Sequence, residues 1–218
     1  MPSDALVLGF DTSAAHCAAA LLRGELCIAQ RSEDMGRGQA ERLMPLIEEL
    51  LAEAGVSWRD LDAIGVGVGP GNFTGVRISV AAARGLALSL GIPAHGVSRF
   101  DSEVLGTGGP VLVALDARQG KIYLQGFLDG AATSAPALEP LEGLAAPATP
   151  VIGDAAAHVA EATGATVLGA AQYPIAEAIA RIAAARLASA AAAPRPAPLY
   201  MRAADAAPPS DPPPVILD

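Results

Sequence analysis

The stretch of sequence that most restricts the fold is an apolar segment that passes through a glycine-rich turn into a helical pattern. Residues 62–68 predict a buried strand, the sequence GPGNFTG follows, and residues 76–90 place apolar side chains at helical spacing. A strand, a tight turn and a helix in this order indicate an α/β fold. No register of the segment contains GxGxxG, because the third glycine would be Pro70, Asn72 or Thr74. The dinucleotide-binding fingerprint of Rossmann folds is therefore excluded.

Three strands and a helix are predicted before this segment. Residues 6–10 form a short apolar run, and residues 17–22 and 26–30 flank a polar turn as the two arms of a hairpin. Residues 38–54 then repeat apolar side chains at the spacing of an amphipathic helix. The first hundred residues thus predict strand, hairpin, helix, strand and helix.

The second half of the chain has a weaker pattern. Its composition shifts to glycine, serine and threonine near Phe100, where we place a domain boundary, and the periodicity is weak between residues 131 and 150. The predicted elements are strands at 111–114, 122–127 and 151–153 and helices at 155–163 and 174–193.

These patterns divide the chain into three parts. Residues 1–99 form a first lobe, residues 100–193 a second lobe, and residues 194–218 a tail that contains eight prolines. We expect residues 197–202 of the tail to dock on the first lobe and the remainder to be disordered.

Charge and composition restrict the classes of partner. The formal net charge is −9, and Lys121 is the only lysine. Nucleic-acid binding needs clustered basic side chains, so we expect no strong direct binding of RNA or DNA. No uncharged apolar run approaches the roughly 18 residues of a membrane span. The beginning of the chain has no basic region typical of a signal peptide, and we expect a cytoplasmic protein without a membrane partner.

The cysteines and histidines do not form a metal or disulfide pattern. In the predicted hairpin Cys27 would lie opposite Ala20 rather than Cys17, so we expect both thiols to be reduced and buried. The three histidines have no second His or Cys at ligand spacing, and the chain lacks HExxH, GxSxG and P-loop motifs. We therefore expect no metal site.

Two polar loops follow predicted strands and are the candidate phosphate-binding elements. Backbone N–H groups at a helix N-terminus attract phosphate, and an acidic residue at a strand end could hold a hydrated Mg²⁺. The alternative is structural, with an Asx-type turn in the first loop and Thr74 as the helix cap in the second. The candidate residues are Asp11, Thr12, Ser13, Gly69, Gly71, Asn72, Thr74 and Gly75.

Five segments together resemble the bacterial TsaB (YeaZ) family. They are LGFDTS, GQAERLMPLIEELL, GVGVGPGNFTGVRISVAAARGLAL, ALDARQGKIY and APLYMR. The resemblance covers residues 5–127 and 197–202, and between 131 and 193 it depends on the order of elements alone. It implies a two-lobed α/β fold of the actin, Hsp70 and sugar-kinase (ASKHA) type, with mixed sheets flanked by helices.

The resemblance also implies a supporting role in tRNA modification. Members of the family pair with TsaD, which transfers the threonylcarbamoyl group to N6 of adenosine 37 in tRNAs reading codons that begin with A; TsaE is a further partner. This chain would then have no catalytic residue and need no cofactor, with ATP, Mg²⁺ and the metal held by TsaD and TsaE. The His-x-x-x-His pair of the catalytic paralogue corresponds here to residues 39–43, QAERL, which contain no histidine. The family usually has serine at the position of Asn72.

Two helices carry more apolar surface than one sheet face requires, which suggests a partner surface. A homodimer of modest affinity is expected for the isolated chain, exchanging with the TsaD pair; the alternative is that the chain covers both faces itself. The candidate interface residues are Ala40, Met44, Ile47, Leu51, Val76, Val80, Ala82, Gly85 and Ser89. Arg77 and Arg84 share one helix face, and we expect structural roles for Arg118, Tyr200 and Arg202.

Two other functions compete with the scaffold role. An autonomous small ATPase or kinase of the same fold would use Asp11 as a magnesium ligand, yet residues 116–118 and 153–154 are poor versions of the further motifs it needs. A tRNA-binding module conflicts with the acidic charge and the scarcity of aromatic residues.

Overall fold

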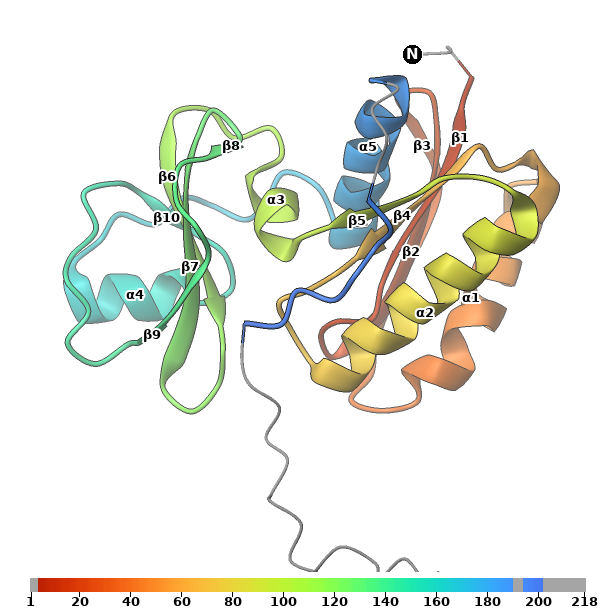
Figure 1. The fold of residues 1–218 in the computed structure, drawn as a ribbon. Helices are drawn as coiled ribbons and strands as arrows, with labels where there is room; N and C mark the ends of the chain where they lie inside the picture. The colour runs from red at the N-terminus through yellow and green to blue at the C-terminus, as the bar shows by residue number, and fades with distance from the viewer. Residues whose placement is uncertain (1–3, 190–193, 202–218) are drawn as a thin grey trace, which may run out of the picture.

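The computed structural model describes residues 4–189 and 194–201, which form two lobes around two β-sheets (Figure 1). The expected end of the helix at 190–193, Arg202 and the remainder of the tail lie outside the described residues.

The first sheet has the strand order β3-β2-β1-β4-β5. β1 pairs antiparallel with β2 and parallel with β4, and β4 and β5 are parallel. The strands are β1 (Leu6–Asp11), β2 (His16–Arg23), β3 (Leu26–Asp34), β4 (Ala63–Gly67) and β5 (Ala94–Val97). Every strand and the hairpin predicted for the first hundred residues are confirmed.

The predicted hairpin register is wrong by a few residues. Cys27 lies opposite Leu22, because β2 continues to Arg23 and the chain turns at Gly24 and Glu25. The pairing register between β2 and β3 shifts at Leu21 and Leu22. Both cysteines are free thiols, as expected. Cys17 is buried and burial raises the pKa of its thiol to about 11, whereas Cys27 is only half-buried.

Helices cover both faces of the first sheet. α1 (Gln39–Glu53) and α2 (Phe73–Leu90) lie side by side on one face, and α5 (Ile175–Ala188) lies on the other (Figure 1). A short 3₁₀ helix, η1 (Trp58–Asp60), precedes β4. The glycines that follow α1 and α2 are left-handed, with φ of 66° at Gly55 and 71° at Gly91, which explains why these two helical patterns end there.

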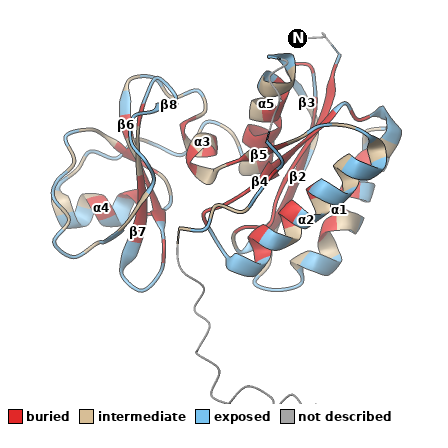
Figure 2. Cartoon of the chain, viewed as in Figure 1, coloured by how far each residue is buried: buried red, intermediate tan, exposed pale blue. Residues whose placement is uncertain are grey.

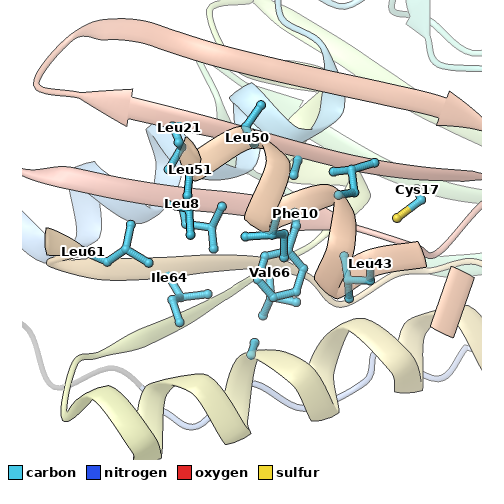
Figure 3. Packing of buried hydrophobic residues seen from close by; sticks show 14 of the residues in the cluster. Leu8, Phe10, Cys17, Leu21, Leu43, Leu50, Leu51, Leu61, Ile64 and Val66 are labelled. Atoms are coloured by element: carbon cyan, nitrogen blue, oxygen red, sulfur yellow. The ribbon is translucent and has the colours of Figure 1, made fainter. Parts of the chain in front are cut away.

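The core under α1 and α2 is mostly aliphatic. Leucines of α1 pack on the apolar side chains of β1 and β4, including Leu8, Phe10, Ile64 and Val66, all fully buried (Figure 3). This packing follows from the helical spacing of Leu43, Leu46 and Leu50, which turns one stripe toward the sheet.

The opposite face is built for close approach between a helix and the sheet. Gly9 of β1 and Gly65 of β4 lie directly under α5, and a Cβ at either position would overlap with the α5 backbone. The helix meets this face with alanines, of which Ala180 and Ala183 are fully buried. Small residues on both sides therefore replace large side chains as the packing surface.

α5 changes the expected division of the chain. Its sequence lies in the segment 100–193 that we assigned to the second lobe, but its contacts are with β1, β2 and β4 of the first. The first lobe therefore comprises β1–β5, α1, α2 and α5, because the glycine face of the first sheet needs a cover that its own hundred residues do not supply.

The second lobe contains the smaller sheet, ordered β10-β6-β7-β8, with β9 also pairing with β7. Its strands are β6 (Pro110–Asp116), β7 (Lys121–Leu128), β8 (Ala131–Ala132), β9 (Ala137–Pro140) and β10 (Val151–Ile152). α4 (Ala156–Thr163) packs on β6 and β10. The predicted strands and the helix at 155–163 are confirmed, whereas β8 and β9 fall in the stretch whose periodicity was too weak for a prediction.

The chain passes between the lobes three times, and one of these crossings is the segment 164–174 between α4 and α5. α3 (Arg99–Val104) lies between α5 and β6, and the extended segment 194–201 crosses from the first lobe to the second (Figure 1). Leu199, in the part of the tail expected to dock on the first lobe, donates its N–H to the carbonyl oxygen of Val68 at 2.8 Å. Its side chain packs against the apolar cores of both lobes.

Candidate functional site

The two lobes enclose a cleft of about 520 Å³. The first lobe contributes the β1–β2 turn and the loop before α2, the second contributes the β6–β7 turn, and residues 199–201 form part of the wall. Cavities of this size accommodate small ligands, so the groups that line it decide what it can do.

The acidic loop after β1 is buried and bonded within the chain. Asp11, Thr12 and Ser13 are all 0% exposed. One carboxylate oxygen of Asp11, Oδ2, accepts hydrogen bonds from the backbone N and the hydroxyl of Ser13, both at 2.9 Å, and lies 2.7 Å from Nε2 of His16. The loop thus forms the Asx-type turn that was the structural alternative.

The other carboxylate oxygen of Asp11, Oδ1, is buried without a hydrogen-bond partner among the described residues. It sits against Gly67, where a Cβ would overlap with it.

The glycine-rich loop places Asn72, not Thr74, at the helix N-cap. The Asn72 side-chain oxygen accepts from the backbone N–H groups of Thr74 and Gly75, both at 3.0 Å. The prediction that Thr74 caps α2 is wrong, because the helix begins one turn earlier than the apolar spacing indicated, at Phe73. Two of the N–H groups that a phosphate would need are therefore already bonded to Asn72.

The glycines of this loop serve contacts with the loop after β1. The N–H of Asn72 donates to the carbonyl oxygen of Ser13 at 2.6 Å, and the hydroxyl of Thr12 donates to the carbonyl oxygen of Gly75 at 2.7 Å. A Cβ on Gly71 or Gly75 would overlap with the backbone of the acidic loop. The structure brings the two candidate phosphate-binding loops together, and these hydrogen bonds join the loops to each other.

The second lobe brings charged groups to the far wall of the cleft. Asp154 accepts from the backbone N of Asp116 at 2.8 Å and from the Arg99 guanidinium at 2.9 Å. Burial raises the pKa of Glu103 on α3, and the nearby charge of Arg99 opposes this shift. Arg118 lines the cleft from the β6–β7 turn, in the left-handed region with φ of 61°. No group of three or more potential metal ligands occurs within residues 4–189 and 194–201.

Of the expected partner surface, only the outer residues are accessible to a partner in this structure. Ala40, Gly85 and Ser89 are exposed, and Met44 and Ala82 are half-buried. The other four candidates, Ile47, Leu51, Val76 and Val80, are at most 4% exposed and belong to the core. Assigning them to the interface was wrong, because the sheet under α1 and α2 is wide enough to cover both apolar stripes.

α2 nevertheless remains largely uncovered within the chain. By length and composition it could cross a membrane, with a mean hydropathy of 1.2, yet only 28% of it is buried. Such a helix is weak evidence for a membrane span, and Arg77 and Arg84 on its exposed side argue against one. Leu88, which the sequence analysis does not name, is 87% exposed. Exposed stretches run along the outer side of α2 (Figure 2).

Tyr200, for which we expected a structural role on the first lobe, contacts the beginning of α2 through partners that the sequence did not identify. Tyr200 reaches across to this helix, where its hydroxyl accepts from Nε of Arg77 at 2.8 Å and its ring lies 5.0 Å from that of Phe73. The partners are 123 residues apart in the chain, and no local pattern could have revealed them.

Comparison with known proteins agrees with this geometry. A family model described as TsaD, tRNA N6-adenosine threonylcarbamoyltransferase, matches residues 33–201, well over half of the chain. An uncharacterized protein of Mycobacterium tuberculosis is 38% identical over 134 residues, which cover 61% of this chain and 64% of the relative. The tRNA threonylcarbamoyladenosine biosynthesis protein TsaB of Escherichia coli is 35% identical over 122 residues, 54% of this chain and 52% of that protein. The chain thus spans about half to two thirds of the length of these relatives.

Solved structures resemble the whole fold. A Pseudomonas aeruginosa protein described as similar to peptidase YEAZ superposes with a TM-score of 0.77 at 30% identity, covering 91% of this chain and 100% of that one. Component A of the (R)-2-hydroxyglutaryl-CoA dehydratase of Acidaminococcus fermentans reaches a TM-score of 0.53 at 12% identity, covering 84% and 99% of the two chains, which is a likeness of fold alone. The expected two-lobed fold class is confirmed.

Proposed function

Because this chain belongs to the TsaB (YeaZ) family, we propose that it is a non-catalytic subunit of the system that forms threonylcarbamoyladenosine in tRNA. In this proposal the chain pairs with TsaD and supports transfer of the threonylcarbamoyl group to N6 of adenosine 37 in tRNAs that read codons beginning with A. TsaE joins a larger assembly, and the chain works in the cytoplasm.

The observation that carries the proposal is the uncovered side of α1 and α2. Only 28% of the residues of α2 are fully buried, and the residues on its outer side, including Arg84, Gly85 and Leu88, are exposed. Leu88 projects from it, and Gly85 beside it has no atom within 4 Å of where a Cβ would stand. An exposed leucine next to a bare stretch of backbone suits close packing against a helix of another subunit.

The loops of the cleft support a role without chemistry. One carboxylate oxygen of Asp11 is bonded to Ser13 and His16, and two N–H groups in the first turn of α2 are bonded to the Asn72 side chain. In this proposal the chain needs no cofactor, and the ATP, Mg²⁺ and metal of the reaction are bound by TsaD and TsaE.

Reconstitution with TsaD, TsaE, ATP, the activated threonylcarbamoyl donor and unmodified tRNA tests the proposal. We expect modification of the tRNA to depend on this chain, and the chain to co-elute with TsaD. Equal modification without the chain would refute the supporting role. Asp11→Asn is expected to preserve modification as long as pairing survives; loss of modification in a paired, folded variant would assign a catalytic role to this chain.

A matched pair of variants tests the surface. Leu88→Asp places a charge on the uncovered side of α2, and Leu128→Asp places the same charge at a leucine that is 48% exposed on the second lobe. We expect only the first to abolish co-elution with TsaD. If both variants pair equally well, the surface lies elsewhere.

The cleft between the lobes favours one alternative, an autonomous ATPase or kinase. Its volume of about 520 Å³ is sufficient for a small ligand. An assay of phosphate release from ATP and Mg²⁺ by the isolated chain separates the two functions: the subunit role predicts no turnover of ATP by this chain alone, whereas turnover that Asp11→Asn removes would establish the alternative.

A further inference from the structure

The segment 194–201, which we call the strap, runs between the lobes without regular secondary structure (Figure 1). It contains three prolines at alternate positions, Pro194, Pro196 and Pro198. Proline fixes φ and has no N–H group, so this alternation makes the strap stiff and leaves it few backbone donors. Among the described residues, its one backbone hydrogen bond to the first lobe runs from the N–H of Leu199 to the carbonyl oxygen of Val68. The strap is therefore a stiff arm that is held at few points.

The C-terminal end of the strap forms part of the wall of the cleft. Leu199, Tyr200 and Met201 line this cavity of about 520 Å³. Leu199 packs against the apolar cores of both lobes and Met201 against that of the second, yet both side chains are only half-buried. A segment with so few buried contacts opens locally at a lower free-energy cost than the sheets on which it lies. Because the strap is stiff, it then leaves as a unit and takes one wall of the cleft with it.

Three exposed side chains, which together we call the latch, fasten the strap to the beginning of α2. They are Phe73, Arg77 and Tyr200. The Tyr200 hydroxyl accepts from Nε of Arg77 at 2.8 Å, and the two aromatic rings lie 5.0 Å apart. The guanidinium carbon of Arg77 lies 3.7 Å from the centre of the Phe73 ring and 5.8 Å from that of Tyr200, so the arginine contacts both rings. The contacts that hold the strap can therefore be reached from outside the cleft.

A second attachment between the lobes lies at Arg99. Its backbone N–H donates to the carbonyl oxygen of Gly69 at 2.8 Å, and its guanidinium donates to Asp154 of the second lobe at 2.9 Å. The carbonyl groups of Val68 and Gly69 are adjacent, so the strap and α3 are both bonded to the end of β4. The Arg99 side chain is only 11% exposed, and its ion pair is therefore less weakened by water than the latch is. This attachment is suited to serve as a hinge that persists when the strap detaches.

We propose that the strap is a releasable closure of the cleft and that Arg77 controls it. With the latch in place, the strap holds the two lobes together. When Arg77 is withdrawn from Tyr200, the strap detaches and the lobes move apart about the end of β4 and Arg99. A molecule that contacts the beginning of α2 then changes access to the cleft, and by linkage a ligand in the cleft changes the affinity for that molecule by the same factor. The latch lies within this chain and does not depend on the proposed function.

A matched pair of arginine variants of the full chain tests the latch through amide exchange followed by NMR. Arg77→Ala removes the stack and the hydrogen bond to Tyr200. Arg84→Ala makes the same change of charge on the same helix, at an exposed side chain that has no hydrogen bond or ion pair in the part of the chain that the structure describes. The amide of Leu199 reports on the strap, and that of Val68, which donates to a carbonyl oxygen of β5 at 2.9 Å, reports on the sheet beneath it.

The two amides are expected to respond differently. Arg77→Ala should speed exchange at Leu199 by about five- to fiftyfold and leave Val68 within about twofold, because only the strap is released. Arg84→Ala should change neither amide. Tyr200→Phe keeps the ring on Phe73 and removes the hydroxyl that accepts from Arg77, so exchange at Leu199 should rise by only about two- to tenfold.

The separation of the lobes is measured between two spin labels, one on each lobe. Arg59→Cys on η1 and Glu161→Cys on α4 place them at exposed positions, in a chain whose two natural cysteines are replaced by alanine. An excess of unlabelled chain restricts the measurement to distances within one copy. Electron double resonance is expected to give one narrow distance distribution for this chain and a broader one with a second maximum after Arg77→Ala. Arg84→Ala should keep the narrow distribution.

Three results would overturn the proposal. Unchanged exchange at Leu199 in Arg77→Ala would show that this arginine does not hold the strap. Equal acceleration at Leu199 and Val68 would mean that the variant loosens the whole first lobe. Faster exchange at Leu199 with an unchanged distance distribution would refute the closure, since the strap then detaches without opening the lobes. TsaD takes no part in these measurements, so the proposed function is decided separately.

Discussion

The packing of α5 on the glycines of the first sheet provides a quantitative test of the fold. The perturbation is Gly65→Ala. A Cβ at this position would lie 2.8 Å from the carbonyl oxygen of Ile179 and 2.9 Å from the Cβ of Ala183. Both atoms belong to the backbone, or stand directly on it, and cannot rotate away. The added methyl group therefore forces α5 to move off the sheet.

The size of the effect follows from two opposing contributions. Overpacking a well-packed core costs about 1–3 kcal/mol. Replacing glycine by alanine also restricts the unfolded chain, which contributes about 0.4–1 kcal/mol in the opposite direction. We expect a net loss of about 1–2 kcal/mol in the free energy of unfolding, or a Tm lower by roughly 2–8 °C for a chain of this size.

Thermal unfolding followed by circular dichroism measures this difference against a matched control. Gly36→Ala makes the same chemical change where no atom lies within 4 Å and the backbone is not left-handed, so its Tm should stay the same or rise. If Gly65→Ala and Gly36→Ala give the same Tm, α5 does not lie on the sheet as closely as described, and the argument for an alanine-lined interface fails.

Three further predictions concern single side chains. Burial lowers the pKa of His95 below its ordinary value of 6.5, and the charge of Arg186 adds to this shift, so the unfolded chain takes up the proton first. The free energy of unfolding should therefore fall as the pH drops below 6.5. Urea titrations at pH 7.5 and 5.5 measure this fall, which should be smaller in His95→Leu than in the natural chain. An equal fall in both chains would contradict the assignment. Asn72→Ala removes the cap of α2 and should lower the free energy of unfolding by about 0.5–2 kcal/mol in urea titrations. Thr74→Ala should change it by only about a few tenths of a kcal/mol. A larger loss in Thr74→Ala than in Asn72→Ala would identify Thr74 as the cap. Leu88→Ala should leave the Tm within about 1 °C, because its side chain is 87% exposed, and still weaken co-elution with TsaD; a large fall in Tm would mean that the chain itself covers this leucine.

Elements with a strong period were predictable from the sequence. The spacing of Leu43, Leu46 and Leu50 gave α1 nearly to its ends, since a helix on a sheet must turn one stripe inward. The N-terminus of α2 was predicted less accurately. Asn72, Phe73 and Thr74 precede the first buried apolar side chain of the helix, so apolar spacing does not indicate where the helix begins.

The residues that form the candidate site were predictable from the sequence, but whether its two loops are free to bind a ligand was not. Sequence reasoning identified both polar loops and left open whether they bind phosphate or make turns. The bonds from Asn72 to Ser13 and from Thr12 to Gly75 show that the loops engage each other, and these bonds span about sixty residues. The same limit explains why Ile47 and Val76 were assigned to an interface, since a helical stripe does not reveal how wide its sheet is.

By itself, the sequence determined the order of the strongly periodic strands and helices, the two polar loops and the acidic character of the chain, because these depend on the periodicity of neighbouring residues and on their charge. It did not predict the short elements β5, α3, β8 and β9. Only the tertiary structure decided that α5 closes the first lobe, that Tyr200 pins Arg77, and which apolar residues remain outside. Those outcomes depend on contacts between residues that are distant in the chain. Local sequence patterns do not show which apolar surfaces pack against each other, and only the packing of the whole chain decides it.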